Sequence, residues 1–262
     1  MELRGRRILL TGASGGIGQA IARRLSADGA RLVLTGRRRD VLEGLAAELG
    51  DAEARPADLT DRDALAELAG LDLDGFVSNA ALPGSGGLDE YSLDQLDRVL
   101  DVNLRAPVVL ARLLAPRLRE RGSGHIAFVT SVSARMPAAW ASLYCTTKFG
   151  LRGFALSLRQ ELRGTGVGVS LVLPGMVRDA GMFAEAGVDP PRGAGTSSPE
   201  EVAAAVVRAI ERDRAELTVA ALAVRLNMEL ASAAPELAGM IGSRLGADDF
   251  MAALARGQRH KR

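Results

Sequence analysis

The chain has 262 residues, of which 47% are hydrophobic and 25% are charged, and its formal net charge is +1. This is the composition of an ordinary globular protein with a sizeable core, and the near-zero charge gives no reason to expect nucleic acid as a partner. The single cysteine, Cys145, excludes an intramolecular disulfide, and His125 and His260 lie too far apart for a zinc motif. Without a signal-peptide pattern or a long apolar run, we expect a cytoplasmic location, no integral membrane segment and no bound metal.

Short apolar runs alternate with longer helical patterns up to about residue 175. The apolar runs are rich in Val, Leu and Ile and predict buried strands at 8–11, 31–35, 75–78, 124–131 and 167–173. The patterns between them predict helices at 17–28, 39–49, 61–69, 92–119 and 142–164. This alternation predicts an α/β fold with a Rossmann-type, doubly wound parallel sheet and helices on both faces. No linker or repeat divides the chain, so we expect one domain over 1–262 with its core at about 5–216.

The last third of the chain has a different character. Residues 176–197 are rich in Gly and Pro and predict a long substrate loop. Residues 198–201, Ser-Pro-Glu-Glu, have the pattern of a helix start and predict a helix to about 212. Residues 217–262 predict a helical extension in two or three pieces. Its apolar stretch could pack over the substrate cleft or on a partner subunit, or could attach to a membrane surface.

A glycine-rich segment, Thr11-Gly12-Ala13-Ser14-Gly15-Gly16-Ile17-Gly18, joins the first strand to the first helix. Glycine permits a positive φ and lets the backbone approach a pyrophosphate, while the helix N-terminus offers free N–H groups. No Gly-Lys-Ser/Thr ending follows, which argues against a nucleoside-triphosphate loop. A tight corner is the alternative, but the strand–turn–helix context favours binding of a dinucleotide by Gly12, Ser14, Gly15, Gly16, Ile17 and Gly18.

Three arginines follow the second strand, directly after Gly36. In dinucleotide-binding folds an acidic residue at this point binds the ribose 2′-hydroxyl, whereas arginine accommodates a 2′-phosphate. The alternative is a basic helix start, which the helix dipole disfavours. Arg37 and Arg38 therefore favour NADP(H) over NAD(H).

Tyr144 and Lys148 are four residues apart in a predicted helix, and Lys148 is one of only two lysines among 33 basic residues. Four-residue spacing places the phenol and the ammonium on one helix face. A nearby cation is expected to lower the pKa of a tyrosine and to make it a usable acid near neutral pH. Taken alone, such a pair is most often a solvated pair on a helix surface.

Together these features resemble the classical short-chain dehydrogenase/reductase family. The motifs follow the family order over residues 5 to about 180, with the glycine turn, Asp58-Leu59, Asn79-Ala80-Ala81, Asn103, Ser131, Tyr144 with Lys148, and Pro174-Gly175. The resemblance implies a catalytic tetrad of Asn103, Ser131, Tyr144 and Lys148. It also implies that the cofactor is bound by Asp58, Leu59, Asn79, Ala80, Ala81, Tyr144, Lys148, Pro174, Gly175 and Val177.

The resemblance assigns a role to each tetrad residue. Tyr144 would exchange a proton with the carbonyl or alcohol oxygen, and Ser131 would hold that oxygen. Lys148 would bind the nicotinamide ribose and lower the pKa of Tyr144, and Asn103 would hold a water that links Lys148 to solvent. Without the resemblance, Ser131, Asn103 and Asp58 could be ordinary turn or helix residues.

The sequence departs from the family pattern at three positions. Ala81 replaces a glycine beside the cofactor, and Asp179 replaces a threonine that would contact the nicotinamide carboxamide. Gly15 lies where NADP-preferring relatives often have a basic residue. The preference for NADP(H) therefore depends on Arg37 and Arg38.

The function expected is an NADP(H)-dependent oxidoreductase that interconverts a hydrophobic ketone or aldehyde and its alcohol. Apolar residues of the substrate loop, Met176, Met182 and Phe183, are expected to close over the substrate, with Met136, Trp140 and Leu143 opposite. An epimerase or dehydratase and a non-catalytic dinucleotide sensor are the alternatives. Relatives imply a homodimer or homotetramer paired through helices 92–119 and 142–164.

Overall fold

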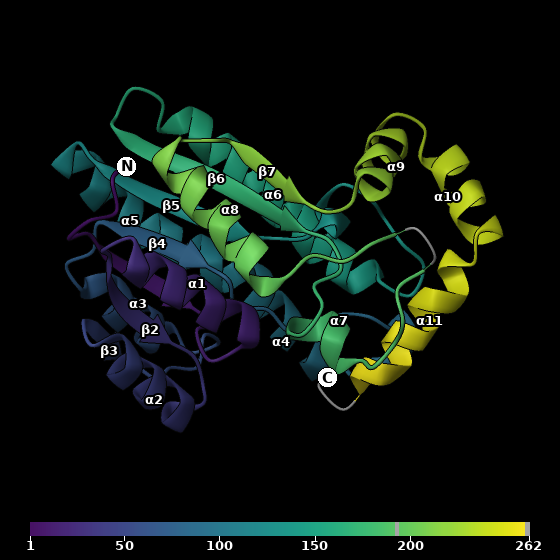
Figure 1. Ribbon diagram of the computed structural model, residues 1–262, viewed down its shortest axis with the longest axis horizontal. Helices are drawn as coiled ribbons and strands as arrows, with labels where there is room; N and C mark the ends of the chain where they lie inside the picture. Colours follow the sequence, from purple (N-terminus) through teal and green to yellow (C-terminus); the bar gives the residue numbers. More distant parts are fainter. Residues whose placement is uncertain (192–193, 260–262) are drawn as a thin grey trace.

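The computed structural model describes residues 1–191 and 194–259. Its centre is a single sheet of parallel strands in the order β3-β2-β1-β4-β5-β6-β7 (Figure 1). The strands are β1 (Arg7–Thr11), β2 (Arg31–Thr35), β3 (Ala52–Ala54), β4 (Gly75–Ser78), β5 (Gly124–Val129), β6 (Val167–Pro174) and β7 (Glu216–Val219). The order reverses between β1 and β4, where a doubly wound sheet opens a crevice for a ligand.

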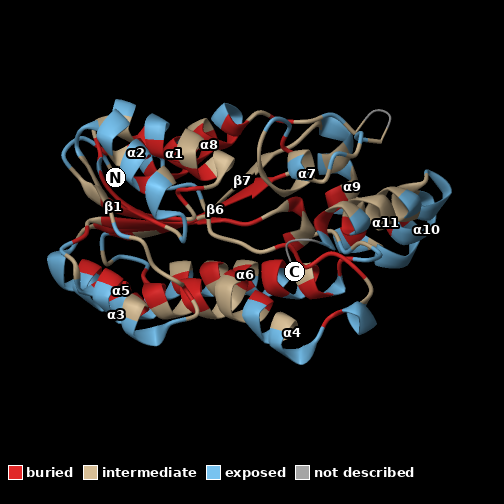
Figure 2. Cartoon of the chain, turned by 90° about the horizontal axis from the view of Figure 1, so that it is seen from below, coloured by how far each residue is buried: buried red, intermediate tan, exposed pale blue. Residues whose placement is uncertain are grey.

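Helices cover both faces of the sheet, as Figure 2 shows. One face carries α1 (Gly16–Ala27), α2 (Arg39–Leu49) and α8 (Pro199–Glu211), and the other carries α3 (Arg62–Gly70), α5 (Ala106–Arg121) and α6 (Ser142–Glu161). The predicted α/β fold with a doubly wound parallel sheet is confirmed.

The central strands are mostly apolar because successive side chains enter opposite cores. In β1, Leu9 packs with the α3, α5 and α6 side, whereas Ile8 and Leu10 pack with the α1, α2 and α8 side. Phe76 and Phe128 meet edge-to-face in the first of these cores, with ring centroids 6.3 Å apart. Burial on both faces explains why these strands were recognisable as short apolar runs.

Two strands at the sheet edges were not predicted. β3 is only Ala-Glu-Ala, and β7 is Glu-Leu-Thr-Val at the start of the segment expected to be helical. Every residue of both strands is half-buried, so neither forms an apolar run. Strand β5 also ends at Val129, two residues earlier than predicted, which leaves Ser131 in the loop beyond it.

The single helix predicted over 92–119 is divided into three consecutive helical segments in the structure. A π-helical turn, η2 (Asp101–Arg105), separates α4 (Leu93–Leu100) from α5. Short 3-10 turns lie nearby at η1 (Leu88–Glu90) and η3 (Val132–Ala134). A π-turn inserts an extra residue into the helical ladder and often marks a functional site.

The described part of the substrate loop contains one short helix, α7 (Gly181–Glu185), and residues 192–193 lie outside the described residues. Helix α8 then begins with the predicted capping box, in which Ser198 Oγ accepts from the Glu201 backbone N–H and the Glu201 side chain accepts from that of Ser198. Three helices follow, α9 (Leu222–Ala233), α10 (Pro235–Arg244) and α11 (Ala247–Gln258). We call these three helices the C-terminal arm.

The C-terminal arm extends away from the sheet and then returns, so that α11 lies against α7 (Figure 1). Helix α11 therefore folds back onto the substrate loop, and packing over the substrate cleft is one of the placements that the sequence analysis left open. None of the helices among the described residues has the length and apolar character needed to cross a membrane. His260 and Lys261, which the sequence analysis mentions, lie outside the described residues.

Candidate active site

The carboxyl ends of the central strands open onto a cavity of about 1450 Å³. Its lining includes every residue predicted to contact cofactor or substrate oxygen except Asn103, namely Gly12, Ser14, Gly15, Gly16, Ile17, Gly18, Arg37, Arg38, Asp58, Leu59, Asn79, Ala80, Ala81, Ser131, Tyr144, Lys148, Pro174, Gly175 and Val177. The cavity lies at the point where the strand order reverses. It therefore has the position of a ligand site in a doubly wound sheet.

Two glycines of the turn, Gly12 and Gly18, are packed so closely that neither position has room for a side chain. Gly12 has a φ of +67°, and a Cβ there would lie 2.7 Å from the Cα of Ala80. A Cβ on Gly18 would collide with the carbonyl oxygen of Gly12. Helix α1 begins at Gly16 with no side-chain cap and no acidic residue in its first turn. The turn therefore presents backbone amides and the positive end of a helix dipole, which fit a dinucleotide pyrophosphate.

Asn79 fixes the glycine turn from the neighbouring strand. Its Nδ2 donates to the carbonyl oxygens of Thr11 and Gly12 at 3.4 and 3.2 Å, and its backbone N–H donates to Thr11 Oγ1 at 3.1 Å. The residue thus joins the end of β4 to the turn after β1. This bonding makes Asn79 a positioning residue for the phosphate site.

Charged groups that line the cavity lie in the segments that follow β2 and β3. Arg37 and Arg38 are both exposed and both line the cavity, and Arg38 also donates to the carbonyl oxygen of Ser14. Asp58 accepts from the backbone N–H and the hydroxyl of Thr60, both at 2.9 Å. The Thr60 backbone N–H is the main reason that the pKa of Asp58 is lowered, so this carboxylate is ionised at neutral pH.

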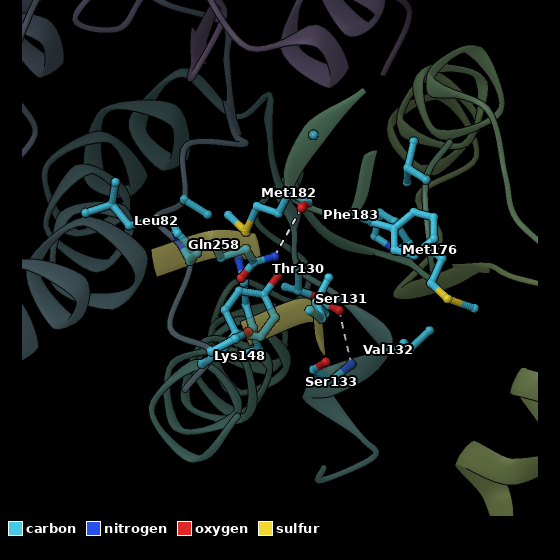
Figure 3. Close-up of a pocket in the computed structure, with 18 of the residues that line it drawn as sticks. Leu82, Thr130, Ser131, Val132, Ser133, Lys148, Met176, Met182, Phe183 and Gln258 are labelled. Carbon is cyan, nitrogen blue, oxygen red and sulfur yellow. Dashed lines mark hydrogen bonds between the residues drawn. The ribbon is translucent and has the colours of Figure 1, made fainter. Parts of the chain in front are cut away.

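The reacting groups come from β5 and α6. Ser131 lies just beyond β5, and its Oγ accepts from the Ser133 backbone N–H at 3.2 Å (Figure 3). Its side chain also lies close enough to the phenol of Tyr144 to lower the pKa of that phenol. Lys148 lies one turn further along α6, with Nζ 5.4 Å from the centroid of the Tyr144 ring. The serine, phenol and ammonium predicted to act together are therefore brought together.

Burial controls the protonation of this group. It raises the pKa of Tyr144 to about 12, with the Ser131 side chain acting in the opposite direction, and it lowers the pKa of Lys148 to about 8. The pKa of Tyr144 is therefore not lowered overall, contrary to the expectation from the sequence, because desolvation of the phenolate is the larger effect. At neutral pH Tyr144 holds its proton and Lys148 holds its charge, so the site contains a proton donor and a buried cation.

Asn103 lies behind the cavity wall, in the π-turn η2. Its Nδ2 donates to the Leu82 carbonyl oxygen at 2.9 Å, and its Oδ1 accepts from the Leu82 backbone N–H at 2.6 Å. Nδ2 also reaches Thr147 Oγ1 of α6 at 3.5 Å. The side chain therefore fixes the loop after β4 against the helix that carries Tyr144 and Lys148. Its predicted role in holding a water stays a prediction.

Asp179, at which the sequence departs from the family pattern, has a side chain that is 76% exposed and pairs with Arg178, and it does not line the cavity. Two sequence-based placements around the substrate are corrected. Trp140 is exposed at the surface, and Leu143 is buried in a cluster with Tyr91, so neither forms the expected wall. The other expected wall residues, Met136, Met176, Met182 and Phe183, do line the cavity.

The C-terminal arm supplies a wall that the sequence analysis did not assign residue by residue. Its lining side chains are mostly apolar and include Val224, Ala231, Ala238, Phe250, Met251 and Leu254, with Asn227 and Gln258 as the amides. The only signal for this wall was the apolar stretch after residue 217. Apolar spacing indicates a helix but not the surface against which it folds.

Comparison with known proteins decides the family. The sequence model of the family described as short chain dehydrogenase matches residues 6–190. This chain belongs to that family. A ketoacyl reductase, HetN, from a Nostoc species is 37% identical over 227 residues, which cover 83% of this chain and 79% of the relative.

Two further relatives of this short-chain dehydrogenase are informative. The 1-deoxy-11-beta-hydroxypentalenate dehydrogenase of Streptomyces exfoliatus is 38% identical over 230 residues, which cover 82% of each chain. The structure of a short-chain dehydrogenase from Sphingobium yanoikuyae in complex with NADPH has a TM-score of 0.75 and 29% identity, covering 92% of this chain and 94% of that one. The protein is thus an oxidoreductase that uses a nicotinamide dinucleotide.

Proposed function

We propose that this short-chain dehydrogenase is NADP(H)-dependent and interconverts a hydrophobic ketone or aldehyde with its alcohol. The observation that carries the proposal is the placement of Ser131, Tyr144 and Lys148 in the same cavity as the glycine turn and an apolar wall. A phosphate-binding turn alone fits many enzymes, and a Tyr–Lys pair alone is uninformative. Together in one cavity they support hydride transfer coupled to proton transfer.

The chain's own residues would perform the proton chemistry. In reduction, Tyr144 donates its proton to the carbonyl oxygen while Ser131 donates a hydrogen bond to the same oxygen. When bound, the dihydronicotinamide supplies the hydride to the carbonyl carbon, and the product is the alcohol. The Lys148 ammonium stabilises the phenolate that remains, because an opposite charge in a buried site favours the ionised form. Oxidation of the alcohol reverses these steps.

Arg37 and Arg38 support the preference for NADP(H). Both side chains reach solvent at the edge of the cavity and are free of any carboxylate in hydrogen-bonding distance among the described residues. An arginine at this point after the second strand suits a 2′-phosphate, since the guanidinium fork matches phosphate oxygens. The NADPH complex of the Sphingobium relative is consistent with this preference.

The apolar lining supports a hydrophobic substrate. Met136, Met176, Met182, Phe183 and the apolar residues of the C-terminal arm surround the space beyond the reacting groups. Methionines are adaptable and suit an irregular apolar molecule. One curated relative is named as a ketoacyl reductase and the other as the dehydrogenase of a hydroxylated pentalenate. Both names are consistent with a carbonyl–alcohol exchange on a largely apolar molecule.

Consumption of NADPH by the purified protein across a panel of aliphatic, aromatic and polycyclic ketones, run beside NADH, tests the function. Net oxidation of NADPH with at least one ketone is expected. Turnover without net consumption would indicate an epimerase instead, and binding without turnover would indicate a dinucleotide sensor. In Tyr144→Phe, kcat should fall about 10²- to 10⁴-fold while the Kd for NADPH stays within about twofold. Full activity of that variant would contradict the assignment of the acid.

We also propose a homodimer or homotetramer in the cytoplasm. Large apolar side chains are exposed on the helices expected to pair, with Leu93 on α4, Leu113 on α5 and Phe149 on α6. Exposed apolar side chains on adjacent helices suit a self-complementary interface. Light scattering coupled to size exclusion measures the assembly, and a monomer at micromolar concentration would contradict it.

A further inference from the structure

Helix α11 is fastened to the substrate loop by close contacts. Gly257 packs on Ala186 so tightly that a Cβ at 257 would collide with the Ala186 backbone. The rings of Phe183 in α7 and Phe250 in α11 pack with centroids 6.2 Å apart. The last residue of α11, Gln258, is therefore held at a fixed place in the cavity wall.

The orientation of the Gln258 amide is determined by one hydrogen bond of its side chain to the substrate loop. Nε2 donates to the carbonyl oxygen of Met182 at 3.1 Å, which Figure 3 marks with a dashed line. A carbonyl oxygen can only accept, so the amide nitrogen must face it and Oε1 must face the other way. The orientation is therefore set by chemistry and cannot be reversed without losing the bond.

The other polar atom of this amide, Oε1, is unpaired in the part of the chain that the structure describes. Gln258 is only 4% exposed and lines the cavity, and its Oε1 has no hydrogen-bond partner among the residues that the structure describes. Buried acceptors are nearly always satisfied in folded proteins, because an unpaired one loses its bonds to water. A buried acceptor on a cavity wall without a protein partner fits a donor that arrives with the ligand.

The surroundings of Gln258 restrict that donor. Much of the neighbouring wall is apolar, with Met182, Phe183, Met251 and Leu254 among the lining residues, and the carboxylates that α7 and α11 add to the lining are Glu185 and Asp248. A few placed polar groups on an apolar wall give a ligand site its orientation and specificity. An uncharged amide oxygen in this setting suits a neutral O–H or N–H donor, whereas an ammonium would call for a carboxylate.

We propose that Gln258 is a specificity-determining residue of this enzyme. Its Oε1 accepts a hydrogen bond from a hydroxyl or amide N–H on the substrate, and the apolar body of the substrate fills the space between that donor and the reacting carbonyl. The preferred substrates are hydrophobic carbonyl compounds that carry such a second, neutral polar group. This inference rests on the proposed function, because it places the carbonyl at Tyr144.

The test uses matched ketones and matched variants. The ketones are linear 2-ketones from hexanone to dodecanone, each with and without one hydroxyl group placed at successive positions along the chain. The variants are Gln258→Met, which removes both the Oε1 acceptor and the Nε2 donor to Met182 with little change in size, and Leu254→Met, which alters the same wall of α11 and leaves the amide in place. Values of kcat and KM with NADPH are measured for every pair, together with the Kd for NADPH.

For the wild type, kcat/KM should be highest for a hydroxylated ketone with the hydroxyl at one favoured position. Gln258→Met should lower kcat/KM for that ketone at least about tenfold, mainly through KM, because the substrate hydroxyl is then buried without a partner. The parent ketone lacks that hydroxyl, so its kcat/KM should fall much less and reports the loss of the Met182 hydrogen bond alone, and the Kd for NADPH should not change. Leu254→Met should keep the wild-type ratio between the two ketones.

Three results would overturn the proposal. Equal losses on both ketones would mean that Gln258 only supports the substrate loop through Met182. A higher Kd for NADPH would mean that the amide binds the cofactor. A wild type that prefers no hydroxylated ketone would mean that Oε1 accepts no hydrogen bond from the substrate. If the wild type reduces no ketone at all, the proposed function itself fails, which is a different result from the first three.

Discussion

Acidification should destabilise this protein through one buried histidine, His125. The side chain lies at the start of β5, at the opposite end of the sheet from the cavity, and is almost fully buried. Its Nε2 is 2.8 Å from Ser170 Oγ, which itself donates to the Ala209 carbonyl oxygen. Because the serine proton is used on Ala209, the ring donates from Nε2 and is neutral.

The size of the effect follows from the pKa of the ring. Burial lowers the pKa of His125 to about 3, and the charges that face it, Asp213, the Met1 amine and Arg159, change this less. The unfolded chain binds a proton near pH 6.5 and the folded chain does not, so stability is lost as the pH falls from 6.5 towards 3. The loss is about 1 kcal/mol at about pH 5.5 and about 3 kcal/mol at about pH 4.5.

Urea unfolding followed by circular dichroism, at fixed protein concentration over about pH 4.5 to 7.5, measures this loss. Carboxylates titrate in the same range, so the informative quantity is the difference between wild type and His125→Gln. The glutamine can donate to Ser170 Oγ but cannot take up a proton. The stability advantage of the wild type should shrink by the amounts given above as the pH falls. A difference that stays constant with pH would refute the burial argument.

The remaining predictions concern the cofactor. Replacing both Arg37 and Arg38 by Ala should raise the KM for NADPH at least about tenfold and the KM for NADH by less than about twofold, because only NADPH has the 2′-phosphate. Steady-state kinetics with both cofactors measure this. An unchanged preference would show that the 2′-phosphate is bound elsewhere. Gly18→Ala should weaken binding of both cofactors alike and lower the Tm, because its Cβ would collide with the Gly12 carbonyl oxygen. Fluorescence titration and thermal melts check this. Wild-type affinity would contradict the close packing of Gly18 on Gly12.

The sequence was sufficient for the parts of the fold in which local pattern and burial agree. Strands such as β1 and β5 enter a core on both faces, so their apolar runs are unbroken. The edge strands β3 and β7 have no such run, and their pairing is decided by neighbours far along the chain. The glycine turn was predictable for a related reason, since its function depends on the backbone that its glycines permit.

The site was less predictable where function depends on distant packing. The spacing of Tyr144 and Lys148 indicates that they share a helix face, but their pKa values are set by the burial around them. Trp140 and Leu143 are close neighbours of Tyr144 in sequence, yet one faces solvent and the other a separate core cluster. The partner of the Gln258 amide lies 76 residues away at Met182 and leaves no pattern in the sequence.

The contacts between α7 and α11 join the part of the chain that the family model matches to a part that lies beyond it. The family match ends at residue 190, and α11 begins at Ala247. The residues proposed to transfer the proton lie in the matched part, whereas much of the apolar lining of the cavity comes from the C-terminal arm beyond it. Substitutions in the C-terminal arm can change which molecule is accepted without touching the chemistry, so substrate range and reaction type can evolve independently in this chain.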